Sequence, residues 1–378
     1  MAEATATPTA SGPKGALGLS RPLPWTPEEL TAEWFSSIME KNIVIATKIM
    51  DAIHSTSSKI LIELTYAEDQ DAGPTKICVK GGFNKAITEQ FPELIGAYQV
   101  ECGFFYHLAP RLSMRIPQSY WSTTDTAGQG LVVMEDLRAT GLTFGDILQP
   151  WTPHQVKRGL EQLADLHAKT WGAKQEGYPW VHDASGIRPL LLNMFSPDAW
   201  KRQFEGPPQT RPPVPERIAN RKLIESRFKA LWNATDDRFQ CIVHGDPHIG
   251  NTFITTDGEP GFLDWQGLHI GSAFHDVAFF IVGTLTIKDR RENERNLVSQ
   301  YLEALHEEGG PRFSVDEVWE EYRMQNFHEI AWALAPSTMQ PAENVSAMTL
   351  RHCAAIEDHE TIDLLQSTPQ WQKEWPHL

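Results

Sequence analysis

One segment, residues 241–266, limits what this chain can fold into more than any other. It holds Asp246, then Asn251 five positions later, then Asp264 thirteen positions after that. Between Asn251 and Asp264, short alternating stretches flank Asp257-Gly258, which is a strong β-hairpin signal. A hairpin would bring Asn251 and Asp264 to one open end. A carboxamide and a carboxylate at that end suit Mg²⁺, which takes oxygen ligands and keeps water or phosphate oxygens in its remaining positions.

The same three residues match the needs of phosphoryl transfer from ATP. That reaction uses one carboxylate to orient and deprotonate a hydroxyl, and an amide oxygen with a second carboxylate to hold magnesium. Protein kinases carry these groups in the order Asp, Asn, Asp. The sequence therefore predicts ATP and Mg²⁺ as cofactors.

The motif His244-Gly-Asp-Pro-His-Ile-Gly-Asn251, followed by Asp264-Trp-Gln266, resembles the aminoglycoside phosphotransferase and choline-kinase-like group, including its ecdysteroid-kinase-like branch. The resemblance covers roughly residues 40–365. It implies a small-molecule kinase with a bilobal α+β protein-kinase-like fold. The small lobe would hold a five-stranded antiparallel sheet and one helix, and the large lobe would be mostly helical. It also implies that Asp246 is the catalytic base, that His244 braces its loop and that Asn251 and Asp264 bind magnesium.

Other interpretations of this region compete with that one. His244, Asp246 and His248 could form a transition-metal triad, although the hairpin would then have no role. His248 alone is expected to be structural rather than catalytic. Downstream, Asp276 in Gly271-Ser-Ala-Phe-His-Asp276 is expected to be a buried anchor for the catalytic loop.

Local patterns divide the chain into a disordered tail (1–25), a nucleotide-binding lobe (26–137) and a catalytic and substrate-binding lobe (138–378). Thr26-Pro-Glu-Glu29 is a capping box that predicts a helix to about residue 41, and a second helix is expected over 89–108. Strands are expected at 42–50, 58–66, 75–80, 113–121 and 130–136. A second capping box at Thr152 starts a core helix, and helices are expected over 216–232, 276–285, 291–308, 315–334 and 341–366.

Several residues of the small lobe are predicted to bind the nucleotide. Lys80 ends a strand and would neutralise phosphate charge, paired with Glu101 or, failing that, with Glu93. The expected phosphate loop has no glycine, so the hydroxyls and amides of its serines would replace a glycine-rich loop. Backbone groups near the end of the hinge strand would pair with adenine. The residues concerned are Ser55, Ser57 and Ser58 in the loop and Glu135 and Leu137 in the hinge.

The acceptor pocket is expected among the C-terminal helices. Aromatic and acidic side chains near residues 327–343 could surround an amine, although core packing is the stronger expectation for each of them. Substrate contacts are predicted at His248, Trp265, His269 and Trp332. The acceptor would be an alcohol, an amino alcohol or a sterol-like compound.

Composition restricts the partners. The net charge of −16 argues against nucleic acid and against an anionic membrane surface. The N-terminus lacks the pattern of a secretory signal, and no apolar run is long enough to span a bilayer. Four scattered cysteines favour reduced thiols and a cytoplasmic location. The predicted protein is a monomer or homodimer that phosphorylates a small-molecule hydroxyl. The alternative is a catalytically weak kinase-like protein that binds a ligand or regulates, which the glycine-free loop favours.

Overall fold

The chain forms two compact units. One comprises residues up to 112 together with 116–140, and the other comprises 113–115 together with the chain from 141 onward. The computed structural model describes residues 15–39, 43–54, 57–67, 73–90, 94–183, 191, 194–207, 211–234, 237–335 and 340–367.

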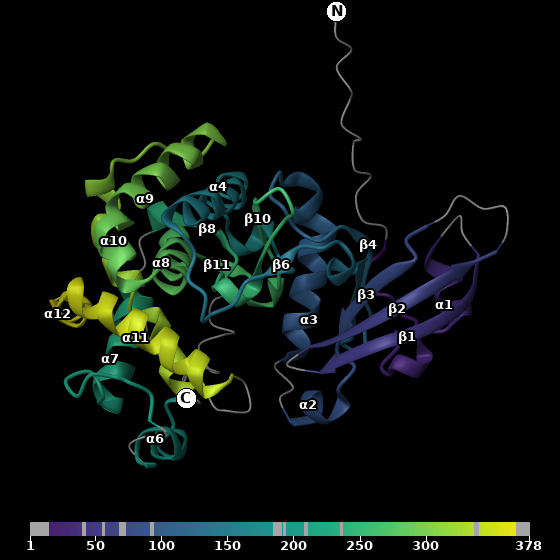
Figure 1. Cartoon of the computed structure of the whole chain (residues 1–378), viewed down its shortest axis with the longest axis horizontal. Coiled ribbons are helices and arrows are strands. Elements are labelled where there is room, and N and C mark those ends of the chain that lie inside the picture. The colour runs from purple at the N-terminus through teal and green to yellow at the C-terminus, as the bar shows by residue number, and fades with distance from the viewer. Residues whose placement is uncertain are drawn as a thin grey trace, which may run out of the picture. The chain divides into compact units, whose positions relative to one another are not determined.

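The first unit is built on a five-stranded antiparallel sheet with the strand order β1-β2-β3-β5-β4 (Figure 1). The predicted five-stranded sheet is therefore confirmed. Its strands are β1 (Val44–His54), β2 (Ser58–Tyr66), β3 (Lys76–Gly81), β4 (Ser119–Thr124) and β5 (Gly130–Glu135).

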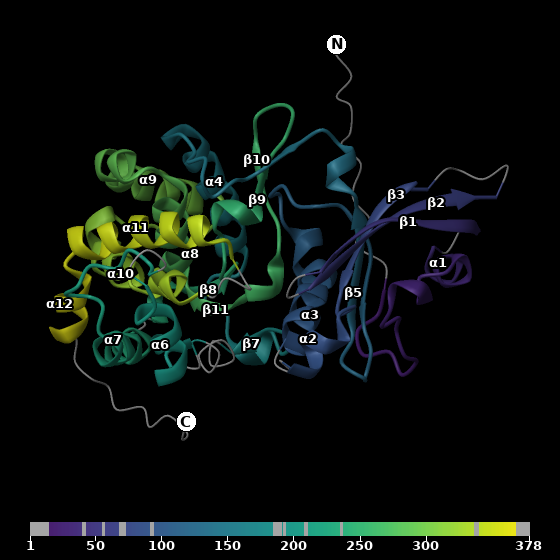
Figure 2. The ribbon, with the colours of Figure 1, turned by 60° about the horizontal axis from the view of Figure 1, so that its bottom comes forward.

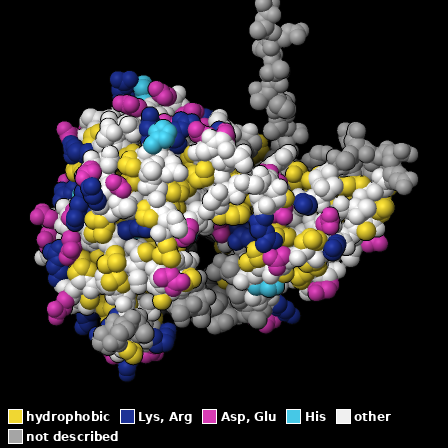
Figure 3. Space-filling view, in the orientation of Figure 1, with side chains coloured by type: hydrophobic (Ala, Val, Ile, Leu, Met, Phe, Trp, Pro, Cys, Tyr) yellow, Lys and Arg dark blue, Asp and Glu magenta, His cyan; other side chains and the backbone are white. Residues whose placement is uncertain are grey.

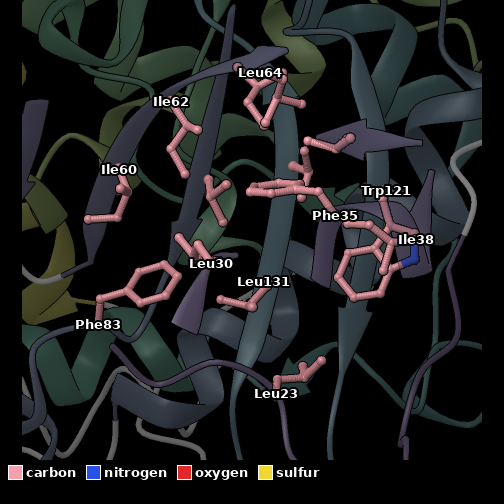
Figure 4. Packing of buried hydrophobic residues seen from close by; sticks show 14 residues of the cluster. Leu23, Leu30, Phe35, Ile38, Ile60, Ile62, Leu64, Phe83, Trp121 and Leu131 are labelled. Carbon is pink, nitrogen blue, oxygen red and sulfur yellow. The ribbon is translucent and has the colours of Figure 1, made fainter. Parts of the chain in front are cut away.

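One face of this sheet carries the hydrophobic core of the unit. Alternate residues of β2, Ile60, Ile62 and Leu64, are buried on the same side, as a pleated strand requires. Figure 4 shows them packed with Phe35 of helix α1 (Ala32–Ile38) and with Trp121 of β4. Burial of such side chains contributes roughly 1.5–3 kcal/mol each, so this layer fixes the register of the sheet.

The helices of the first unit differ from the prediction. The capping box at Thr26 starts only a 3-10 turn, Pro27–Glu29, and Leu30 leaves the helical region before α1 begins. The segment expected to form one helix over 89–108 forms several helical elements. These are α2 (Lys85–Gln90), α3 (Leu94–Gly103), a π-helical turn (Phe104–Leu108) and a 3-10 turn (Ala109–Arg111).

The prediction of a disordered tail up to residue 25 is wrong for residues 15–25, which are ordered by contacts with the rest of the first unit. The N–H of Leu19 donates to Thr124 O at 2.8 Å, and Thr126 N donates to Leu19 O at 2.9 Å. Leu23 is buried in the core, and its N–H donates to the carboxylate of Asp125 at 2.8 Å. Asp125 therefore fastens this segment to the β4–β5 turn. Residues 1–14 lie outside the described residues.

The second unit is mostly helical, as predicted. The capping box at Thr152 is present at the start of its long core helix, and Pro occupies the first helical turn. The predicted helix over 341–366 breaks at Glu360, which has a left-handed φ of 52°. The helices are α4 (Pro153–Lys169), α6 (Pro197–Phe204), α7 (Arg221–Ala234), α8 (Ala273–Thr284), α9 (Ile287–Glu307), α10 (Val315–Gln325), the 3-10 helix η11 (His328–Leu334), α11 (Ala342–Asp358) and α12 (Thr361–Ser367).

Helix α8 is the centre of this unit, since all of its residues are buried. It packs against α4, α9, α10 and α11, and Figure 2 shows α8 and α11 crossing within the helical layer. Gly159 of α4 allows close approach, because a Cβ there would lie 2.4 Å from the ring of Phe280. An apolar helix with no solvated face is expected at the core of a large domain.

Two small sheets lie in the second unit and carry the segment that the motif singled out. One has the order β10-β9-β6 and the other β7-β11-β8. The strands are β6 (Thr143–Phe144), β7 (His182–Asp183), β8 (Gln240–Val243), β9 (Thr252–Ile254), β10 (Pro260–Phe262) and β11 (His269–Ser272).

On the face of the second unit that Figure 3 shows, basic and acidic side chains are interspersed. On α9, Lys288 and Glu292 form an ion pair whose charged atoms are 4.0 Å apart. Within the described part of the chain, every helix falls short of the length and apolarity that a bilayer crossing requires.

Replacing Asp125 with Ala is expected to release the N-terminal segment. The carboxylate accepts hydrogen bonds from Leu23 N, Ala127 N and Gln129 N at 2.8–2.9 Å. Loss of these three hydrogen bonds should cost about 2–3 kcal/mol. Hydrogen exchange should show faster exchange of the Leu23 amide in Asp125→Ala. The exposed neighbour Thr126, changed to Ala, is the control, and equal protection of Leu23 in both variants would contradict the anchoring role.

Candidate functional site

The catalytic loop predicted from the motif is held by a buried carboxylate. Asp276, in the first turn of α8, accepts hydrogen bonds from His244 N at 2.6 Å and from Gly245 N at 3.0 Å. Both oxygens are used, so the two consecutive amides after β8 are fixed in position. This agrees with the expectation that Asp276 is an anchor.

A second layer of buried polar groups supports Asp276. His167 Nε2 lies 3.1 Å from Asp276 Oδ2, and His167 Nδ1 lies 2.8 Å from the hydroxyl of Tyr301. All three side chains are fully buried. Burial alone would raise the pKa of Asp276, but the hydrogen bond from His167 and the fields of nearby histidines lower it to about 2. The carboxylate is therefore charged at neutral pH. Sequence reasoning missed His167 and Tyr301.

Gly245 is required by the shape of this loop. Its φ is +82°, and a Cβ there would lie 2.0 Å from the carbonyl oxygen of Gly267. An L side chain would both strain the backbone and collide with the segment that follows Asp264. The Gly of the motif thus allows the two segments to pass in contact.

His244 braces the loop through both ring nitrogens. Its Nε2 lies 2.9 Å from Leu263 O, and its Nδ1 accepts from Asp246 N at 3.3 Å. A carbonyl can only accept, so the proton sits on Nε2 and the ring is neutral. Because both nitrogens are used in this way, the alternative metal triad of His244, Asp246 and His248 is not supported.

The hairpin predicted between the two metal-ligand candidates is present. β9 and β10 are antiparallel with Thr252 opposite Phe262, and the turn closes with Gly258 at φ +88°. Leu263 N donates to Asn251 O at 2.8 Å, which places Asp264 directly after the residue paired with Asn251. The structure therefore brings the two side chains to the same end of the hairpin.

Two features orient these candidates. The Asn251 amide nitrogen donates to Asp246 O and to Asp246 Oδ2, both at 3.0 Å, which turns the amide oxygen away from Asp246. Asp264 has a left-handed backbone, with φ 64° and ψ 79°. Such a conformation is uncommon outside glycine and is concentrated at functional sites.

Asp246 lies among other carboxylates. Desolvation and the negative charges of Glu329 and Asp264 raise the pKa of Asp246. The side chain keeps 47% of its surface exposed, so water screens the effect of burial and the neighbouring charges are the firmer cause. A cation bound beside Asp264 would oppose this shift.

His248 is placed close to Asp246 but has a structural hydrogen bond. Its Nδ1 accepts from Gly250 N at 3.0 Å, which caps the 3-10 turn Ile249–Asn251. Its Nε2 lies 3.7 Å from Asp246 Oδ2, and the ring packs edge-on against Trp332 at 5.2 Å. Burial lowers the pKa of His248 to about 4, so the ring is neutral at pH 7.

The other two predicted substrate residues, Trp265 and His269, have partners within the protein. Trp265 is fully buried, with its ring 4.5 Å from that of His244, so a substrate contact would require that packing to open. His269 Nδ1 lies 2.8 Å from Gly267 O, and burial together with His275 lowers the pKa of His269 to about 3. Trp265 is a packing residue in this structure.

Sequence reasoning placed His328 and Glu329 beside the acceptor pocket, but it did not assign His275 or His352 to the site. His275 Nε2 lies 3.2 Å from Gly245 O, and the rings of His275 and His328 are 4.4 Å apart. Burial raises the pKa of Glu329 to about 8. Within the described residues, His352 is buried with neither ring nitrogen hydrogen-bonded. The only sequence signal was the acidic and aromatic composition near residues 327–343.

The nucleotide-binding candidates of the first unit include a buried ion pair. Lys80 Nζ on β3 lies 2.8 Å from Glu101 Oε1 on α3, and both side chains are 4% exposed. Glu101, the partner that was predicted first for Lys80, is therefore its partner in the structure. Glu93, the second choice, lies outside the described residues.

Part of the expected serine loop belongs to strands. β1 continues to His54, which pairs with Ser58 at the start of β2. Ser57 and Ser58 are buried, and the hydroxyl of Ser58 lies 2.8 Å from His54 Nδ1. Ser55 lies outside the described residues.

The two hinge candidates lie at the end of β5. The N–H of Glu135 donates to Gln118 O at 3.0 Å, and Leu137 starts a 3-10 turn capped by Asp136. The nucleotide contacts predicted for the serines, Glu135 and Leu137 stay predictions.

Replacing Asp276 with Asn should destabilise the folded chain by about 2 kcal/mol at pH 7, because the folded pKa of about 2 lies below the ordinary 3.8. A lowered pKa stabilises the folded state above pH 3.8, and this contribution is lost as the pH falls toward 2. The stability gap between wild type and Asp276→Asn should therefore narrow in acid. Urea unfolding at several pH values measures it, with the exposed Asp198→Asn as control. Equal stability of wild type and Asp276→Asn at pH 7 would contradict the anchor.

Comparison with solved structures finds distant neighbours. The macrolide 2'-phosphotransferase MphH from Brachybacterium faecium is 16% identical with a TM-score of 0.45, covering 80% of this chain and 91% of that chain. The choline kinase LicA from Streptococcus pneumoniae is 14% identical with a TM-score of 0.49, covering 85% and 96%. Neither neighbour's substrate is carried over to this chain at such identities. A comparison with curated protein sequences finds no match.

The family model described as "Ecdysteroid kinase-like family" matches residues 49–309. The matched part is more than half of the chain and contains the catalytic-loop motif and the hairpin. The suspected kinase-like family and the predicted fold class, a five-stranded antiparallel sheet with a mostly helical unit, are confirmed. The chain belongs to the ecdysteroid kinase-like family.

Proposed function

We propose that this protein is an ATP- and Mg²⁺-dependent phosphotransferase that acts on the hydroxyl group of a small molecule. The observation that carries the proposal is the bond from the Asn251 amide to Asp246, at the hairpin end that also presents Asp264. One residue thus links the candidate base to the candidate metal ligands. Membership of a kinase-like family supports the same class of reaction.

The donor set fits magnesium. The Asn251 amide donates its hydrogens to Asp246, so the oxygen is the atom left for a metal, and Asp264 adds a carboxylate. Hard oxygen donors in small number are typical of Mg²⁺ that also binds substrate phosphates. When bound, magnesium would offset the negative charge of the transferring phosphoryl group.

Asp246 would orient the acceptor hydroxyl and take its proton. Its carboxylate keeps enough exposed surface to meet a substrate, and its orientation is fixed by Asn251. Positioning is expected to contribute more than base strength, because the transition state of phosphoryl transfer is loose. The hydrogen bonds from His244 and Gly245 to Asp276 supply the rigidity that positioning requires.

In the first unit, Lys80 would neutralise charge on the nucleotide phosphates. The buried contact with Glu101 holds the Lys80 side chain in a fixed direction. The backbone groups of Glu135 and Leu137 would pair with the base, and the serine turn would contact phosphate.

A second candidate is a kinase-like protein that binds a ligand without efficient turnover. Two observations favour it: the sequence between β1 and β2 has no glycine, and the Ser57 and Ser58 side chains are buried. Backbone amides approach phosphates most closely where glycine is present. The intact set of Asp246, Asn251, Asp264 and Lys80 opposes this candidate.

Turnover should depend on Asp246. In an ADP-release screen over alcohols and amino alcohols, Asp246→Ala should lower kcat by more than roughly a hundredfold, because base and positioner are lost together. Asp198→Ala, at an exposed position of α6, is the control and should keep wild-type activity. Equal turnover by wild type and Asp246→Ala would reject Asp246 as the central residue.

Nucleotide binding can be measured without an acceptor. ATP with Mg²⁺ should raise the melting temperature, since a ligand at a hundred times its Kd stabilises by about 2.7 kcal/mol. Asp264→Asn should lose the magnesium-dependent part of this shift. A full shift with no turnover on any acceptor would favour the binding-only candidate, and no shift at all would reject the kinase.

A further inference from the structure

We infer that His275, His328 and Glu329 form a binding site for a transition-metal ion of the Zn²⁺ type, separate from the magnesium ligands. One ring nitrogen of each histidine and one carboxylate oxygen of Glu329 lie within 4.8 Å of one another. His275 is in the first turn of α8, and the other two residues begin η11. Two of the three lie beyond the residues that the family model matches.

The donor set selects the metal. Two imidazole nitrogens and one carboxylate are a common ligand set of zinc, which takes them at about 2.0–2.2 Å. Magnesium prefers oxygen ligands and is not expected to bind here. A tetrahedral ion would require the three donor atoms to close by about 1 Å, which rotation of the Glu329 and His328 side chains can supply.

The hydrogen bonding of His275 is that of a metal ligand. Its Nε2 lies 3.2 Å from the carbonyl oxygen of Gly245, so Nε2 carries the proton and the lone pair is on Nδ1. Metal-binding histidines almost always donate their other N–H to a carbonyl or carboxylate, because this fixes the ring and its tautomer. The catalytic loop itself supplies that carbonyl.

The burial of Glu329 gives a second, independent argument. The residue is 5% exposed, and its ion-pair partner is His328, whose Nδ1 is 2.7 Å from Glu329 Oε1. In the part of the chain that the structure describes, no lysine or arginine pairs with it. Buried carboxylates are normally paired or coordinate metals.

A metal at this position would have a structural consequence for the site. It would join η11 to α8, and through the ring of His275 it would hold the carbonyl of Gly245, next to Asp246. It would thus fix the C-terminal helices to the loop that carries the candidate base.

The experiment uses the full-length protein, treated with chelator and then dialysed against Zn²⁺ alone. We expect one zinc per chain by elemental analysis, and tetrahedral absorption bands when Co²⁺ replaces it. Because both readouts are made on wild type, they do not depend on the folding of a variant. The inference is overturned if no stoichiometric zinc is bound or if bound Co²⁺ lacks those bands.

Variants locate the ion. His328→Ala and Glu329→Gln should each weaken zinc binding at least tenfold, whereas His306→Ala, an exposed histidine of α9, should not change it. Asp264→Asn should also retain zinc, which separates this site from the magnesium ligands. Zinc bound equally by wild type, His328→Ala and Glu329→Gln would place it elsewhere. Loss of zinc in Asp264→Asn alone would assign it to the magnesium ligands, and either result overturns the inference.

Discussion

The geometry of the candidate catalytic loop depends on one buried carboxylate. Asp276 receives two consecutive backbone amides, and each of its oxygens serves one of them. Burying an unpaired carboxylate would cost several kcal/mol of folding free energy. The two amides and His167 therefore stabilise Asp276, and Asp276 in turn fixes the loop. The result is a loop whose backbone cannot shift without exposing a charge to the apolar core around α8.

The hairpin positions the two candidate metal ligands, Asn251 and Asp264, at one of its ends. Backbone pairing between β9 and β10 sets the register, and the bond from Leu263 N to Asn251 O continues it to the open end. His244 then bonds to the carbonyl of the same Leu263. The catalytic loop and the hairpin therefore share one residue, so the positions of Asp246 and Asp264 are set by a single continuous set of hydrogen bonds within the second unit.

The parts that the sequence predicted correctly depend on local pattern. Asp257-Gly258 between alternating stretches determines the hairpin, and Thr152 with Gln155 determines the start of α4. The residues missed are joined over long separations: His167 meets Asp276 from 109 positions away and Tyr301 from 134. Nothing near His167 in the sequence distinguishes it from other histidines on helices. The proximity of Glu329 to Asp246 could not be predicted either, because it arises only when η11 packs on α8.

The misjudged N-terminal segment makes the same point for the fold. Residues 1–25 have the composition of a disordered tail, yet Leu19 and Leu23 are fixed by contacts with the β4–β5 turn. Two apolar side chains and one acceptor suffice, because Asp125 already needs N–H donors inside the turn. Composition averages over such a segment and cannot detect one buried acceptor elsewhere in the chain. Whether a segment is ordered thus depends on hydrogen-bonding groups elsewhere in the chain. The N-terminal segment depends on Asp125, just as the conformation of the catalytic loop depends on Asp276.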